Sequence, residues 1–371
     1  MHTRGASDNP RPILSGIQLL RGLSAVLVVA AHANLMMGNP KNFGVSPFPL
    51  RDAGMFGVAV FFVISGFIIG MVSLDTEWRP RLSKGDYAWR RFVRIVPFLW
   101  LSVIGYNILS SVGTGEVEWL PFLRAMTLWP IGELKPNVVW SLQHEMIFYI
   151  LFALAMLGTR IRLWILALWF VAPLVYGGAI ALFGHAAIPA NTAVAELFRV
   201  VLLGGFSGAN VQFGAGFILG LVWLRSPALS RMRLPGGLVI ATILIALATV
   251  IVEIMAFPIA GFGRMIVWSA MAMVIVAVGM LVRDEKGPLQ TIGMVLGNAS
   301  FSIYLVHNAV LLILFKAALW MPDALPLSLL FFFFFGVATL AGVVVHYLVE
   351  APLISLLSHG QPLFPWQRRT A

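Results

Sequence analysis

The chain has 371 residues, of which 60% are hydrophobic and 11% are charged. Soluble domains carry about 25% charged residues, so this composition excludes a soluble protein and predicts a polytopic membrane protein. The chain has no cysteine, which excludes disulfides, thiolate metal sites and cysteine nucleophiles. The net charge of +10 also suits a nucleic-acid partner, so the placement of the basic residues has to decide between the two classes.

The hydrophobic residues gather in about ten segments, each near the roughly 20 residues that a spanning helix needs. The segments are 13–37, 54–74, 92–112, 137–157, 161–183, 197–224, 236–256, 262–282, 295–316 and 326–348. They predict an all-α fold with a tail over 1–12, a transmembrane domain over 13–352 and a second tail over 353–371. The sixth segment is rich in glycine from Gly204 to Gly220, which favours a broken or partly re-entrant helix.

The basic residues alternate between the two sides of this topology. With the N-terminus inside, sixteen lysines and arginines fall in inner segments and six in outer ones. Positive residues concentrate on the cytoplasmic side of membrane proteins, so both termini are predicted to be cytoplasmic. Most of the positive charge then follows from topology, and we expect membrane lipid rather than nucleic acid as a partner.

The first apolar segment carries an arginine and a histidine, Arg21 and His32, eleven residues apart. Eleven residues make three helical turns plus about 20°, so both side chains lie on one face, about 16 Å apart along the axis. Ionisable groups inside a bilayer usually face a polar cavity. The structural alternative is an arginine that snorkels to the interface and a histidine that bonds to a neighbouring helix.

The second and third segments add small residues and clustered arginines. Ser65 and Gly66, with Gly70, offer a surface for close helix packing, which we expect to bring this helix against the one with His32. Arg91 and Arg94 share one face near the start of the third helix. Such a pair can bind phosphates or anionic lipid headgroups, and both readings stay open.

The fourth segment begins on the outer side with Ser141, Glu145 and Tyr149 on one helix face. A carboxylate inside the membrane requires a partner, such as a cationic side chain or a substrate hydroxyl. A structural ion pair is the alternative reading for Glu145.

The ninth segment contains Ser300, Ser302, Tyr304 and His307, of which Ser300, Tyr304 and His307 lie close to one face. A histidine among hydroxyl groups is more often a helix contact than a catalyst, so we rank His307 below His32.

Together these patterns resemble the acyltransferase-3 family of integral membrane acyltransferases over about residues 15–352. The resemblance rests on the order and spacing of several motifs. They are Arg21 with ten residues before His32, the helix Phe61-Phe62-Val63-Ile64-Ser65-Gly66-Phe67, Arg91 and Arg94 before Pro97, Ser141-Leu142 with Glu145 and Phe148-Tyr149, Ser300 to His307, and Glu350 before Pro352. Within the family, the chain is most similar to stand-alone exopolysaccharide O-acetyltransferases, such as those acting on rhizobial succinoglycan.

The resemblance implies a cytoplasmic acyl-CoA donor, usually acetyl-CoA, and a glycan hydroxyl or lipid-linked oligosaccharide as acceptor. It implies no metal and no bound cofactor, and a location in the bacterial inner membrane. Acyl transfer to a hydroxyl needs a general base, for which histidine suits neutral pH, so His32 is the candidate. Glu145 is expected to orient the acceptor or His32. The arginines Arg21, Arg91 and Arg94 are expected to bind CoA.

The same reading gives a supporting role to the polar residues Ser65, Ser141, Tyr149, Ser302, Tyr304 and His307. Direct transfer and an acyl-histidine intermediate are both open. The chain departs from the family pattern in having Ala59 where many members have Asp, and in having His144 beside Glu145.

Two other classes compete with an enzyme. A secondary transporter or flippase of polysaccharide precursors would also need buried charges and a glycine-broken helix, although the chain has no convincing internal repeat. A non-catalytic scaffold gives no reason for Arg21 and His32 to share a face. The sequence leaves the oligomeric state open.

Overall fold

The computed structural model describes residues 14–50, 52–156, 160–184, 192–204, 208–256, 259, 261–282, 287–318 and 325–358. These residues form a bundle of helices with two isolated β-bridges, which confirms the predicted all-α class. The two predicted tails, 1–12 and 353–371, lie largely outside the described residues.

The helices follow the predicted segments closely, with additional short helices between them. The elements are α1 (Ser15–Met37), α2 (Ala53–Ser73), α3 (Lys84–Thr114), α4 (Trp119–Thr127), η1 (Asn137–Val139), α5 (Trp140–Met156), α6 (Arg160–Phe183), α7 (Ala193–Leu203), α8 (Ala209–Arg225), α9 (Pro227–Arg231), α10 (Gly236–Ala256), α11 (Gly261–Gly279), α12 (Pro288–Ala318), α13 (Leu327–Val345), η2 (His346–Glu350) and α14 (Ala351–Leu357).

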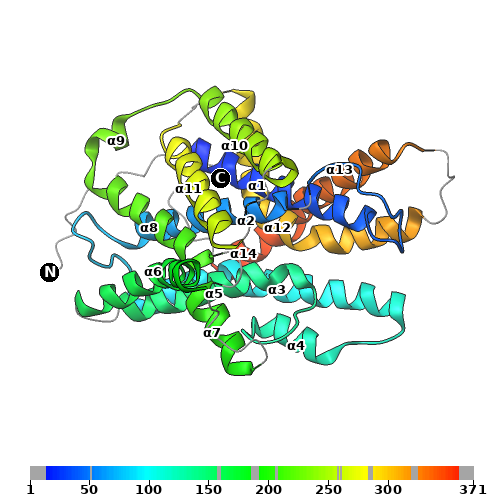
Figure 1. Ribbon diagram of the computed structural model, residues 1–371, viewed down its shortest axis with the longest axis horizontal. Helices are drawn as coiled ribbons and strands as arrows, with labels where there is room; N and C mark the ends of the chain where they lie inside the picture. The colour runs from blue at the N-terminus through cyan, green and yellow to red at the C-terminus, as the bar shows by residue number, and fades with distance from the viewer. Residues whose placement is uncertain are drawn as a thin grey trace.

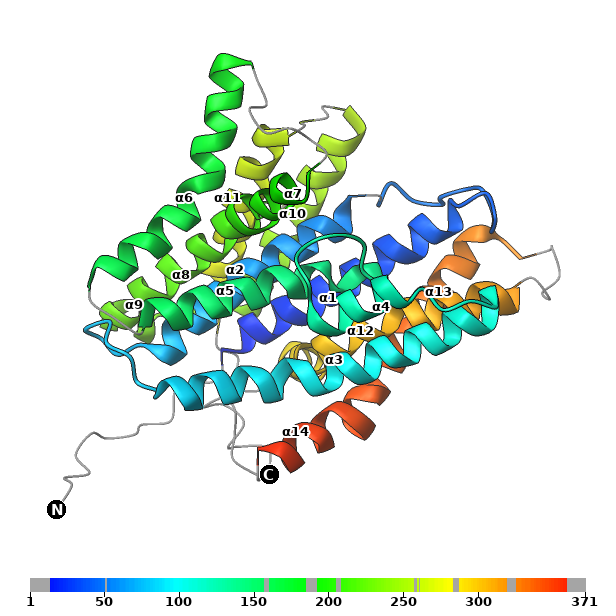
Figure 2. The same ribbon diagram turned by 90° about the horizontal axis from the view of Figure 1, so that it is seen from below.

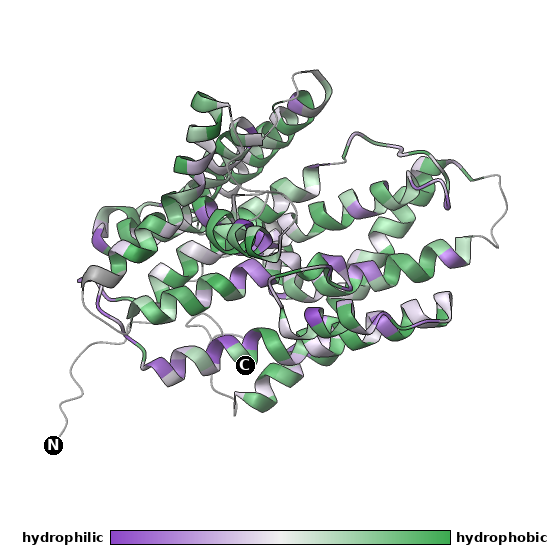
Figure 3. Ribbon diagram, turned by 60° about the horizontal axis from the view of Figure 1, so that its bottom comes forward, coloured by the Kyte–Doolittle hydropathy of each residue, from purple (hydrophilic) through white to green (hydrophobic). Residues whose placement is uncertain are grey.

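The bundle presents an apolar exterior. Figure 3 shows hydrophobic colouring along the greater part of every long helix, with hydrophilic residues gathered in loops and at a few positions within the bundle. Among the described residues, nine helices are long and apolar enough to cross a membrane, so the protein is a multi-pass membrane protein. An α-helix pairs its backbone polar groups within the segment, which is the condition for spanning a bilayer.

The sixth predicted segment is broken, as its glycines indicated. It forms the separate helices α7 and α8, and α7 ends at Gly204 (φ +65°) while α8 begins after Gly208 (φ +65°). Both conformations lie in the left-handed region that glycine adopts at little cost. The break divides the segment into helices of 11 and 17 residues.

The direction of α12 relative to α1 indicates that α8, although it has only 17 residues, also crosses the membrane. Gly22 of α1 faces Leu296 of α12, and further along both helices His32 faces His307, so α1 and α12 run parallel. Parallel helices require an odd number of crossings between them. That condition holds only when α8 is counted with α2, α3, α5, α6, α10 and α11. The distribution of basic residues predicts that the ends of α1 and α13 that lead to the termini both lie on the cytoplasmic side.

The bundle is centred on α1, α2 and α12, which cross the middle of the molecule in Figure 1. Helix α3 runs along one side of this centre in Figure 2, beside α12 and α5.

The helix α2 is buried over nearly its whole length, with Ala59 only 2% exposed in an apolar cluster. An aspartate would therefore be poorly accommodated at this position.

The small residues of α2 pack against two different helices. Gly54 and Gly57 face α1, whereas Gly66 and Gly70 face α8. The prediction that Ser65, Gly66 and Gly70 bring α2 against the helix of His32 is therefore wrong for the two glycines. The helical period decides the outcome, because residues 54 and 57 lie on a different face from residues 66 and 70.

We expect Gly216→Ala to destabilise the protein strongly. A Cβ at Gly216 would lie 1.8 Å from the carbonyl oxygen of Val63, and this contact is with backbone that cannot move without separating α2 from α8. Overpacking of this kind costs about 1–3 kcal/mol and occasionally more, so the thermal unfolding temperature in detergent should fall by several degrees. Gly105→Ala is the control, because a Cβ there meets no atom within 4 Å. Equal unfolding temperatures for both variants would contradict the proposed α2–α8 contact.

Candidate active site

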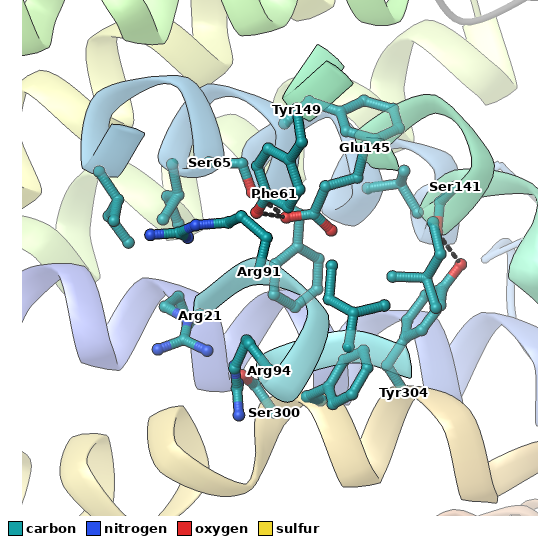
Figure 4. A pocket seen from close by; sticks show the side chains of 17 residues that line it. Arg21, Phe61, Ser65, Arg91, Arg94, Ser141, Glu145, Tyr149, Ser300 and Tyr304 are labelled. Carbon is teal, nitrogen blue, oxygen red and sulfur yellow. Dashed lines mark hydrogen bonds between the residues drawn. The ribbon is translucent and has the colours of Figure 1, made fainter. Parts of the chain in front are cut away.

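A cavity lies among α1, α2, α3, α5 and α12, and it contains most of the polar residues that the sequence analysis selected. Its free space is about 100 Å³. It is lined by Arg21, Val58, Phe61, Phe62, Ile64, Ser65, Ile68, Arg91, Arg94, Ile95, Ser141, Leu142, Glu145, Tyr149, Ser300, Phe301 and Tyr304. Figure 4 shows the three arginines at one end and the pair formed by Ser141 and Tyr304 at the other.

The arginine end is formed by α1 and α3. Arg21 donates to Gln18 Oε1 at 3.0 Å, and Arg94 forms an ion pair with Glu350. Arg91 is 5% exposed, and its guanidinium lies 5.3 Å from the ring centroid of Tyr149. Three cations thus converge on a small volume, which strongly favours an anionic ligand there.

A second, smaller pocket adjoins this end of the cavity. It shares Arg21 and Ile68 with the cavity and reaches Leu14 and Ile17 near the beginning of α1. The two pockets are therefore neighbours along α1 and α2, and Arg21 lies between them.

The carboxylate of Glu145 lies between the two ends of the cavity. Its Oε1 accepts a hydrogen bond from Ser65 Oγ at 2.9 Å and another from the Tyr149 hydroxyl. Figure 4 shows its other oxygen turned to the interior of the pocket. Two hydroxyl donors fix the orientation of this carboxylate and help to offset its removal from water.

The end opposite the arginines is held rigidly by Tyr304. Its hydroxyl accepts from Ser141 Oγ at 2.7 Å and donates to the carbonyl oxygen of Val138 at 2.7 Å. The ring of Phe61 meets the Tyr304 ring edge to face, with 6.2 Å between centroids. Both rings line this end of the cavity and form its wall, whereas His32 and His307, which follow on α1 and α12, are not among the lining residues.

A histidine pair lies one turn beyond this wall. His307 Nε2 is 2.9 Å from His32 Nδ1, and His307 Nδ1 is 3.1 Å from the carbonyl oxygen of Ile303. His307 is fully buried, whereas His32 is partly exposed. The pair therefore joins α1 to α12 on the side of the wall that faces away from the arginines.

The hydrogen bonds define the tautomers of the pair in its neutral form. A carbonyl oxygen can only accept, so His307 Nδ1 carries the proton and His307 Nε2 is an acceptor. His32 Nδ1 must then donate to His307 Nε2, which leaves the lone pair of His32 on Nε2. Such an arrangement orients an imidazole as a base, as a hydrogen-bonded partner does in other catalytic histidine sites.

The predicted residues thus divide into two groups. Eight line the cavity, namely Arg21, Ser65, Arg91, Arg94, Ser141, Glu145, Tyr149 and Tyr304. His32 and His307 lie beyond it, and Ser302 donates to Glu350 behind it. The expectation that Arg21 and His32 face one cavity is not met, because Arg21 lines the cavity and His32 does not. Glu145 likewise bonds within the cavity rather than to His32.

Two features were not assigned a site role from the sequence. Ser300 lines the cavity because it lies four residues before Tyr304 on one helix face, whereas Ser302 points to another face. Glu350 binds Arg94, and the sequence signal for it was its place two residues before Pro352 in the family resemblance. His144 is buried against Phe62 and Trp140, outside the cavity.

The fold and the cavity define an integral membrane protein with a buried polar site that carries cations, a carboxylate and a histidine pair. The family described as acyltransferase domain matches residues 14–348, which is nearly the whole described chain. The protein belongs to this family, and it is a membrane acyltransferase.

Two curated proteins are similar to the chain. The exopolysaccharide production protein ExoZ of Rhizobium meliloti (strain 1021) is 29% identical over 317 residues, which cover 81% of this chain and 90% of that protein. The acyltransferase MdmB of Streptomyces mycarofaciens is 26% identical over 379 residues, which cover 95% of this chain and 94% of that protein. No solved structure matches the chain significantly.

Proposed function

We propose that the protein transfers an acyl group, in the simplest case acetyl, from acyl-CoA to a hydroxyl of an exported or cell-envelope glycan. The observation that carries the proposal is the histidine pair one turn beyond an arginine-lined cavity. The family supports acyl transfer, and the printed name of one relative, an exopolysaccharide production protein, supports a glycan acceptor. The family and the bacterial sources of both relatives support a location in the bacterial inner membrane, and the distribution of basic residues supports an arginine end that faces the cytoplasm.

The donor is proposed to enter from the arginine end. Arg21, Arg91 and Arg94 offer cationic donors for the phosphates of CoA, and the pantetheine arm then extends past Glu145 toward Tyr304. The free oxygen of Glu145 is available to an amide N–H of this arm. The thioester reaches His32 when the ring of Phe61 turns aside, because Tyr304 is fixed by two hydrogen bonds and Phe61 is not.

The acceptor is proposed to meet the thioester at His32. His32 Nε2 takes the proton of the attacking hydroxyl as its oxygen bonds to the thioester carbonyl carbon. The carbon–sulfur bond then breaks, and the proton passes from His32 to the departing sulfur, giving an ester and CoA. Because His307 accepts from His32 Nδ1, the pair holds the reactive nitrogen in place and stabilises the imidazolium that forms.

The transporter alternative is less well supported. Helices broken at a transport site line that site, but among the described residues, α7, α8 and the glycines Gly204 and Gly208 that flank the break do not line the cavity.

An assay of acyl-CoA turnover by the purified protein tests the proposal. The protein in detergent is mixed with acetyl-CoA and a glycan or lipid-linked oligosaccharide extract, and release of free CoA is followed. We expect release that depends on the extract and an acetyl ester on the glycan. A transporter needs a sealed membrane and would give neither product in detergent, and CoA release without an acetylated acceptor would also contradict the proposal.

A further inference from the structure

A buried carboxylate lies directly behind the arginine end of the cavity. Glu350 has no exposed surface, and its two oxygens are shared among three donors from three elements. Its Oε1 accepts from Arg94 Nη1 of α3. Its Oε2 accepts from Ser302 Oγ of α12 at 2.6 Å and from His346 Nδ1 at 2.8 Å.

The local backbone turns this carboxylate inward. Residues His346 to Glu350 form a single π-helical turn between α13 and α14, and Pro352 follows within the first turn of α14. Turns of this kind are rare and occur frequently at functional sites. His346 and Glu350 are four residues apart, so they contact each other on the same face while Glu350 also reaches α3 and α12.

The geometry points to Glu350, with His346 and Ser302, as a positioning group that fixes Arg94 for the phosphates of the donor. This inference rests on the proposed function. Arg94 stacks over the ring of Phe301 at 5.1 Å and keeps 14% of its side chain exposed, against 0% for Glu350. Glu350 therefore does not touch the cavity, and it acts through Arg94.

Two arguments favour positioning over simple stabilisation. A buried ion pair seldom adds stability relative to apolar residues of similar volume, so stability alone gives little reason to place three polar side chains around one arginine. A guanidinium also has five N–H donors, and Glu350 uses those of Nη1 only, which leaves the rest of the fork for an anion in the cavity. Glu350 thus orients the Arg94 guanidinium so that its remaining N–H groups face the cavity.

The test is a double-mutant cycle on CoA binding. The dissociation constant of CoA is measured by calorimetry with the full-length protein in detergent, for the wild type, Glu350→Gln, Arg94→Gln and the double variant. We expect Glu350→Gln to weaken CoA binding about tenfold, as for a misoriented charge-assisted hydrogen bond. The double variant should bind no more weakly than Arg94→Gln, because Glu350 acts only through Arg94.

A donor without phosphates separates positioning from a general structural effect. The Michaelis constant for acetyl-CoA should rise about tenfold in Glu350→Gln with little change in kcat, whereas kinetics with S-acetyl pantetheine should stay as in the wild type. Glu253→Gln is the matched control, because Glu253 is also a buried glutamate paired with an arginine, Arg264, and does not line the cavity. It should leave both donors unaffected.

Several outcomes would overturn the inference. They are additive losses in the double variant, equal losses with both donors, or wild-type protein that binds no CoA. If Glu350→Gln does not fold, Ser302→Ala and His346→Leu each remove one donor to the carboxylate, and an unchanged CoA affinity in both would overturn it too. CoA binding without any turnover would refute the proposed function while the cycle still decides the role of Glu350.

Discussion

Replacement of His32 by alanine is expected to abolish acyl transfer while CoA binding persists. A general base contributes about 10²- to 10⁴-fold to the rate, so kcat should fall by that factor. His32 lies beyond the wall of Phe61 and Tyr304 and does not line the arginine cavity, so the dissociation constant of CoA should change by less than about twofold. Glycan-dependent CoA release gives the first quantity, and calorimetry with CoA gives the second.

Two further histidines serve as comparisons in the same experiment. His144→Gln should keep wild-type turnover, because its ring contacts Phe62 and Trp140 rather than the cavity or the pair. His307→Ala should lower kcat less than His32→Ala, because it removes the partner that orients the base and leaves the base itself. Full turnover in His32→Ala would discard His32 as the catalyst and leave the assignment of the family unchanged.

The sequence was sufficient for the fold class and for nearly every spanning helix, because the length of apolar segments is set by the bilayer. The sequence was not sufficient to predict which helices pack against one another. Gly66 and Gly70 indicated a close helix contact, but periodicity defines only the face on which a residue lies, and it carries no information about which helix meets that face. The partner of these glycines is α8, and only the folded arrangement gives it.

The same limit applies to the site. The buried arginines, Glu145 and the hydroxyl residues were found because polar groups stand out in an apolar segment. The bond between His32 and His307 joins positions 275 residues apart, and nothing in either segment specifies it. The position of His32 outside the cavity that Arg21 lines was missed for a related reason, since a shared helix face does not require a shared cavity.

Replacement of Arg91 by glutamine is expected to raise the Michaelis constant for acetyl-CoA by about 10- to 100-fold with a small change in kcat. Hydrogen bonds to charged groups contribute about 1.5–3 kcal/mol, and glutamine keeps a polar end without leaving a charge in the cavity. The effect should disappear with S-acetyl pantetheine, which has no phosphate to bind. Steady-state kinetics with the two donors measure both quantities.

Arg90→Gln is the matched control, since it removes the same charge from the neighbouring position of α3, and Arg90 does not line the cavity. Equal changes in the two variants would show that the arginines act through the membrane surface, as positive-inside charges do. A loss of folded protein in Arg91→Gln alone would instead identify its contacts with the rings of Tyr87 and Tyr149 as its main role. A donor-specific rise confined to Arg91 is expected because only this arginine of the two is buried among the residues that line the cavity.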